Sequence, residues 1–174
     1  MVWSYGIFGF GYILPATFLP VLARSLVPDP RLFGLAWPLF GATAVASVVL
    51  AVVWLRHATR LQVLATSQGL MGLGVLLPSL VLSGWSIALS ALLVGGTFMV
   101  ATLAGIQEMR ARAGAGAPPA LAVMTSAFAL GQIAGPLVSS ALLRWTPLGE
   151  ARALDLALPI GAAPLFARPA WLWR

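Results

Sequence analysis

Apolar residues run through this chain in long stretches, and charged residues are confined to the short segments between them. Each stretch is about twenty residues long, which is the length of helix that crosses a bilayer core of ~30 Å. A charge near the bilayer centre costs about 2.5–3.5 kcal/mol on the insertion scale, so a membrane helix is expected to exclude it. The pattern therefore predicts an all-α integral membrane protein that crosses the bilayer repeatedly and has no soluble domain.

Six transmembrane spans are predicted, five of them continuous and the sixth broken by prolines. Their ranges are 3–23, 34–55, 61–82, 86–107, 120–143 and 154–173. The segment 111–120 is rich in Ala, Gly and Pro, and it is interpreted as a flexible cytoplasmic connector between the first four spans and the final pair.

The tryptophans agree with these boundaries, because amphipathic rings prefer the headgroup level of a bilayer. All seven lie within about a turn of a predicted span end: Trp3, Trp37, Trp54, Trp85, Trp145, Trp171 and Trp173. Tryptophans of an ordinary soluble core would be scattered through the middles of the helices instead.

The formal net charge of +6 does not indicate a nucleic-acid-binding surface, because the arginines are divided among separate loops. Anionic lipid headgroups are the expected counter-charge. Six spans would place Arg56, Arg60, Arg110 and Arg112 on one side with the C-terminus, and this side holds more arginine than the other. By the positive-inside rule both termini are expected in the cytoplasm of a bacterial cell, with the chain in its inner membrane. Glu108 is expected to pair with Arg110 or Arg112 in a structural or gating cluster.

No catalytic signature is present in the sequence, so an enzyme is not predicted. Zinc-protease, nucleophile-elbow and phosphate-loop motifs are all missing, cysteine is absent and His57 is the single histidine. No cofactor or metal is expected. The predicted spans also hold no acid or base at mid-membrane, which is where ion-coupled carriers usually keep one.

Neutral polar residues within the spans are the candidates for contact with a solute. Tyr5 and Tyr12 share one helix face with Phe8, because their spacing is i, i+3, i+7. Thr125 and Gln132 form a similar stripe in the fifth span, and Gln68 is a further candidate in the third. Two interpretations stay open for the tyrosines: the wall of a solute cavity, or helix packing with each hydroxyl bonded to neighbouring backbone.

Small residues predict where helices approach each other closely. Gly6, Gly9 and Gly11 flank the tyrosines of the first span. Gly131 and Gly135 have the GxxxG spacing that lets a second helix pack tightly, and Pro136 follows them. These six residues are interpreted as packing or gating positions.

Three segments, 5–20, 33–41 and 124–136, resemble the C-terminal half of a major facilitator superfamily (MFS) transporter of the YbfB/YjiJ type. The resemblance covers residues 4–143 and implies a carrier of two six-helix halves, with the solute bound between them near the midplane. The spans would then be helices seven to twelve. The segment 131–136 resembles the glycine–proline motif of the fifth helix, here at the symmetry-related position in helix eleven, a motif associated with alternating access. The loop between helices eight and nine keeps only Arg56 and Arg60 of the family's charged motif.

Two hypotheses follow. The first is an alternating-access carrier of a small solute, of which this chain is one half. Such a half is not expected to transport alone, and it would need a separate N-terminal half or a second copy. The second is a non-transporting membrane scaffold, or the remnant of a truncated transporter gene. A reading frame upstream with six further apolar spans would favour the first.

Overall fold

The structure, a computed structural model, describes residues 1–26, 36–54, 57–145 and 158–166. All regular secondary structure in these ranges is helical, which confirms the all-α class. The elements are α1 (Val2–Leu26), α3 (Ala36–Trp54), α4 (Arg60–Leu80), α5 (Gly84–Ala113), the 3₁₀ turn η1 (Gly114–Gly116) and α6 (Ala117–Trp145). A further helical segment covers 158–166. The rest of the predicted sixth span, 154–157 and 167–173, lies outside the described residues.

Two of the helices begin at capping boxes. Thr59 Oγ1 accepts a hydrogen bond from the Gln62 backbone N–H at 3.2 Å, and the Gln62 side chain accepts one from the Thr59 N–H at 2.9 Å. Ser83 and Ser86 make the same reciprocal pair before α5. Each box satisfies two backbone donors that the first helical turn leaves unpaired, so these starts are fixed locally.

The prediction of a flexible connector over 111–120 is wrong. Helix α5 continues to Ala113, the single turn η1 follows, and α6 begins at Ala117. Gly114 ends α5 with a φ of 53°, a conformation that glycine adopts without steric cost. Pro118 and Pro119 fall in the first turn of α6, where a missing N–H breaks no intrahelical bond.

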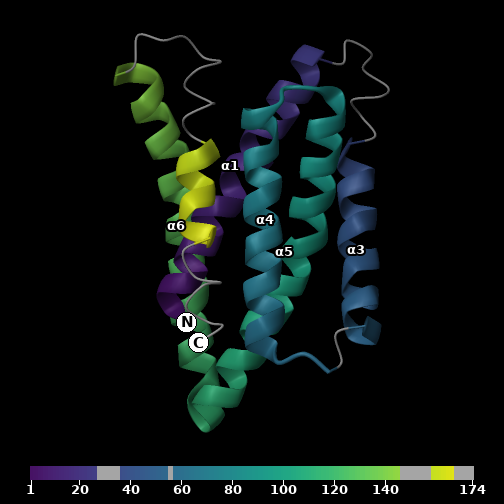
Figure 1. The fold of residues 1–174 in the computed structure, drawn as a ribbon. Helices are drawn as coiled ribbons and strands as arrows, with labels where there is room; N and C mark the ends of the chain where they lie inside the picture. The colour runs from purple at the N-terminus through teal and green to yellow at the C-terminus, as the bar shows by residue number, and fades with distance from the viewer. Residues whose placement is uncertain (27–35, 55–56, 146–157, 167–174) are drawn as a thin grey trace.

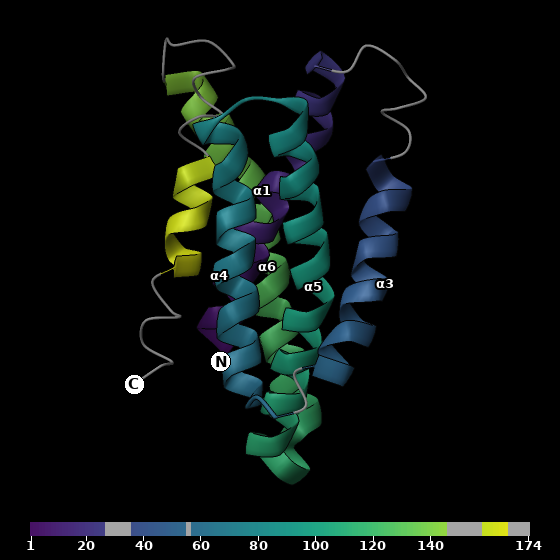
Figure 2. The ribbon, with the colours of Figure 1, turned by 45° about the vertical axis from the view of Figure 1, so that its right-hand side comes forward.

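The helices stand side by side and alternate in direction, so the start of α1 and the α3–α4 and α5–α6 connections lie at the same end (Figure 1). Helices α3 and α4 each pack along α5, while α6 packs along α1. Helix α1 also contacts α4 and α5, and these contacts join the α1–α6 pair to the group formed by α3, α4 and α5 (Figure 2). The segment 158–166 packs on α1 and α4, with Leu165 beside Gly11 and Phe166 beside Gly72.

The outer surface of this bundle is strongly apolar. Two helical stretches of the described residues, Arg60–Leu80 and Gly84–Ala141, are long and apolar enough to cross a membrane by length and composition. The second includes both α5 and α6. Large apolar side chains face outward along the helices, among them Val45, Leu73 and Leu130. Trp3 and Trp85, at the starts of α1 and α5, are 86% and 88% exposed. Apolar exposure on this scale is rare on a soluble monomer and indicates an apolar surrounding.

Candidate functional site

Five aromatic side chains from three helices meet in the interior, and we refer to them as the aromatic cluster. Its members are Tyr5, Phe8 and Tyr12 of α1, Phe98 of α5 and Phe128 of α6. The Tyr12 ring stacks on the Phe98 ring with 4.1 Å between centroids. Phe8 lies 5.3 Å from Phe128 and meets Tyr5 edge-on at 5.5 Å. These are separations at which aromatic rings attract each other beyond simple burial.

The members of the cluster differ in burial. Phe8 is fully buried and Tyr5 is 4% exposed, while Tyr12, Phe98 and Phe128 are half-buried. The cluster therefore has a tightly packed base, and each of the three helices also contributes one half-buried ring.

Tyr5 is held by the neighbouring helix. Its hydroxyl donates to the Thr102 carbonyl of α5 at 2.9 Å, and its ring packs against Gly105. A side chain at position 105 would occupy the space of that ring. This geometry is the backbone-bonded arrangement that the sequence left open as the packing alternative. Tyr12 instead stacks on Phe98 and is half-buried.

The polar candidates of α6 lie next to the cluster. Thr125 and Gln132 share the face of α6 that carries Phe128, because the three are spaced i, i+3, i+7. Thr125 is exposed and Gln132 is half-buried, so both keep hydrogen-bonding groups near the accessible rings.

Gln68 has a different environment. It comes from α4, which contributes no ring to the aromatic cluster, and it is 1% exposed. Among the described residues its Nε2 has no hydrogen-bond partner, and the same holds for the buried Ser4 Oγ of α1. A buried amide without a partner is costly, so Gln68 stays a candidate for contact with water or solute inside the bundle.

The predicted glycines line the contact between α1 and α6, and we refer to Gly6, Gly9, Gly131 and Gly135 as the glycine seam. A Cβ at Gly9 would overlap the Phe128 carbonyl, and one at Gly131 would overlap the Gly6 carbonyl. Gly135 faces Ile13. The seam thus holds the two backbones close together and sets the position of Phe128 relative to α1.

Two of the six predicted packing or gating residues lie away from the glycine seam. Gly11 faces Leu165 of the segment 158–166. Pro136 is exposed on α6.

Four charged residues, Arg60, Glu108, Arg110 and Arg112, gather at the end where α4 begins and α5 ends. Glu108 accepts a hydrogen bond from Arg112 Nε at 2.6 Å, one helical turn away, so Arg112 and not Arg110 is its partner. Arg60 and Arg110 are exposed, and Arg56 lies outside the described residues.

The sequence reasoning did not single out Phe98. Its only signal is its place between two hydroxyl residues, Thr97 and Thr102, in a span whose other residues before Gln107 are small or apolar. Both hydroxyls donate to backbone carbonyls of their own helix, so they do not mark a site by themselves.

The apolar exterior and the two long apolar helical stretches are typical of a helical membrane protein. A family model described as "Uncharacterised MFS-type transporter YbfB" matches residues 1–168, and the chain therefore belongs to this family of MFS transporters. It is a transporter family and not an enzyme family, and its members are membrane proteins. No curated protein and no solved structure matches the chain.

Proposed function

We propose that this chain forms the C-terminal half of an MFS carrier that moves a small solute across the bacterial inner membrane. Helices α1, α3, α4, α5, α6 and the segment 158–166 would supply helices seven to twelve, with both termini in the cytoplasm. The observation that carries the proposal is the aromatic cluster, because α1, α5 and α6 share it and each of them contributes one half-buried ring to it.

The chemistry of the cluster suits a solute with an apolar or aromatic body. Tyr12, Phe98 and Phe128 offer ring faces, and Thr125 and Gln132 add hydrogen-bonding groups within the same region. No charged residue belongs to this set. Recognition by this half would therefore rest on stacking and on neutral hydrogen bonds, and the coupling charge of an ion-driven carrier would come from elsewhere.

The glycine seam supports a rocking mechanism. Because the backbones of α1 and α6 are in direct contact, these helices and the aromatic cluster between them would move as one body. A second six-helix half, or a second copy of the chain, would complete the solute pathway and act as the other body. We expect no solute flux from a purified monomer alone.

Solute flux that depends on the cluster is the direct test. Cells expressing the chain with its flanking reading frames would be given an isotope-labelled metabolite mixture, and mass spectrometry would identify any solute whose accumulation depends on the chain. Tyr12→Ala is expected to lower that flux at least tenfold, because it removes the ring stacked on Phe98. Trp3→Ala is the matched control, since Trp3 is an aromatic residue of α1 outside the cluster. Finding no chain-dependent solute would favour the non-transporting scaffold.

Topology is tested independently by labelling single cysteines, since the native chain has none. Ala115→Cys, in η1, is expected to react with a membrane-impermeant maleimide only after the cells are permeabilised. Leu82→Cys, in the exposed α4–α5 connection, is expected to react in intact cells. Labelling of both cysteines from the same side would contradict the proposed transmembrane arrangement.

A further inference from the structure

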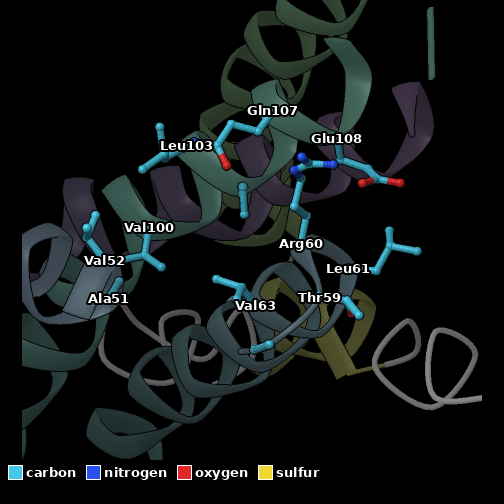
Figure 3. A pocket seen from close by; sticks show the side chains of 12 residues that line it. Ala51, Val52, Thr59, Arg60, Leu61, Val63, Val100, Leu103, Gln107 and Glu108 are labelled. Carbon is cyan, nitrogen blue, oxygen red and sulfur yellow. The ribbon is translucent and has the colours of Figure 1, made fainter. Parts of the chain in front are cut away.

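A cleft lies between α3, α4 and α5 and opens at the end of the bundle where α4 begins; Figure 3 shows its lining residues. Its volume is about 610 Å³. Helix α5 forms the floor, and α3 and α4, which each pack along α5, form the walls. This volume falls within the usual range for small-molecule sites, roughly 300–1,000 Å³.

The cavity has two chemically distinct parts. Apolar side chains from all three helices line most of it, including Val52 of α3, Val63 of α4 and Val100 and Leu103 of α5. Polar groups are gathered where α4 begins: the Arg60 guanidinium lies between the side chains of Gln107 and Glu108 (Figure 3).

The charges at this mouth favour an anion. Glu108 is already paired with Arg112, whereas the structure shows no ion pair for Arg60 among the described residues. The described charges near this end are therefore Arg60, Arg110 and Arg112 against one glutamate. A planar guanidinium can bind a phosphate through two parallel hydrogen bonds.

We propose that this cleft binds an anionic phospholipid, with the phosphate at Arg60 and Gln107 and an acyl chain along Val52, Val100 and Leu103. The apolar part of the cleft matches the acyl chain of the lipid, and the cationic mouth matches its headgroup. A lipid of one leaflet presents these two parts in the same order. Arginines near an anionic leaflet attract such lipids in any case, and the cleft adds a shaped site to that attraction.

Two other ligands fit the cleft less well. A soluble phosphate would contact Arg60 but leave the apolar lining unused. A neutral lipid would fill the lining but leave Arg60 without its counter-charge. A transported solute is expected at the aromatic cluster, so the lipid site is independent of the proposed function.

Native mass spectrometry of the detergent-purified chain tests this site. With phosphatidylglycerol added, we expect the wild-type chain to retain lipid and Arg60→Gln to retain at least fivefold less. Arg110→Gln is the matched control, because Arg110 is an exposed arginine of the same end that does not line the cleft. Leu103→Trp, which fills the apolar part and keeps the charge, is expected to lower retention by a similar factor.

Competition experiments distinguish a lipid phosphate from a soluble phosphate. Inorganic phosphate and glycerol 3-phosphate are expected not to displace the lipid, and phosphatidylcholine is expected to be retained at least fivefold less than phosphatidylglycerol. Equal losses in Arg60→Gln and Arg110→Gln would overturn the proposal in favour of general surface attraction. Displacement by inorganic phosphate, or unchanged retention in Leu103→Trp, would also overturn it. If Arg60→Gln fails to fold, Arg60→Lys and Leu103→Trp are compared with Arg110→Gln in the same retention assay.

Discussion

Gly131→Ala is expected to lower the free energy of unfolding by about 3 kcal/mol, because overpacking of a tight contact costs roughly that much. A Cβ at position 131 would overlap the Gly6 carbonyl and come within 2.8 Å of the Phe10 backbone nitrogen. Both are backbone atoms, so no side chain can rotate away, and α1 and α6 must separate. Loss of that contact would also shift Phe128 away from Phe8 and Tyr12.

The measurement is thermal unfolding in detergent, with the loss of the folded protein monitored by size-exclusion chromatography. For a chain of this length a loss of 3 kcal/mol corresponds to a fall in Tm of about 10 °C. Gly41→Ala is the matched control, because Gly41 lies within helix α3 and a Cβ there would meet nothing within 4 Å. Since alanine favours a helix over glycine by about 1 kcal/mol, this control is expected to stabilise the chain slightly. Equal effects of the two substitutions would show that α1 and α6 are not in backbone contact.

The glycine spacing marked a close helix contact but did not identify the partner helix. Gly131 and Gly135 are four residues apart, so they lie on one helix face, and that much follows from the sequence. Which helix meets that face depends on the arrangement of the whole bundle. The structure shows that Gly6 and Gly9 provide the complementary surface, 122 or more residues earlier in the chain.

The helices themselves were predictable from the length of the apolar stretches, but their ends were not always so. Helix α5 extends to Ala113 because Glu108–Ala113 contains good helix formers and Glu108 pairs with Arg112 at i, i+4. A reading based on hydropathy ends the helix where the apolar residues end, whereas a helix leaving the membrane can continue into water.

The candidate site was predictable only where its members share one helix. The spacing of Tyr5, Phe8 and Tyr12 placed them on a single face, and the structure has all three in the aromatic cluster. Phe98 joins them through tertiary packing, for which no local spacing exists. Gln68 shows the same limit, since the sequence placed it at membrane depth but could not distinguish an accessible surface from the buried position that the structure shows.

Phe8→Ala is expected to cause the largest loss of stability, about 4 kcal/mol, because truncating a buried phenylalanine leaves a cavity that its neighbours fill only in part. Phe8 is fully buried and lies within 6 Å of Tyr5, Phe98 and Phe128, with ring centroids at 5.5, 5.8 and 5.3 Å. In a membrane bundle the helices are held together mainly by van der Waals packing. The contacts that the Phe8 ring makes with its neighbours are therefore lost outright when the ring is removed.

A graded series makes this prediction specific. Phe8→Leu keeps most of the volume and is expected to cost about 1 kcal/mol, while Leu80→Ala, at a position 74% exposed, is expected to change stability by less than about 0.5 kcal/mol. Thermal unfolding in detergent measures all three variants. If Phe8→Ala were as mild as Leu80→Ala, Phe8 would not be at the centre of the packed base. Phe8 contacts rings from both α5 and α6. Phe8→Ala is therefore also expected to reduce solute flux, whereas Phe8→Leu is expected to preserve it. This result would connect the packed base of the aromatic cluster to the function of its half-buried rings.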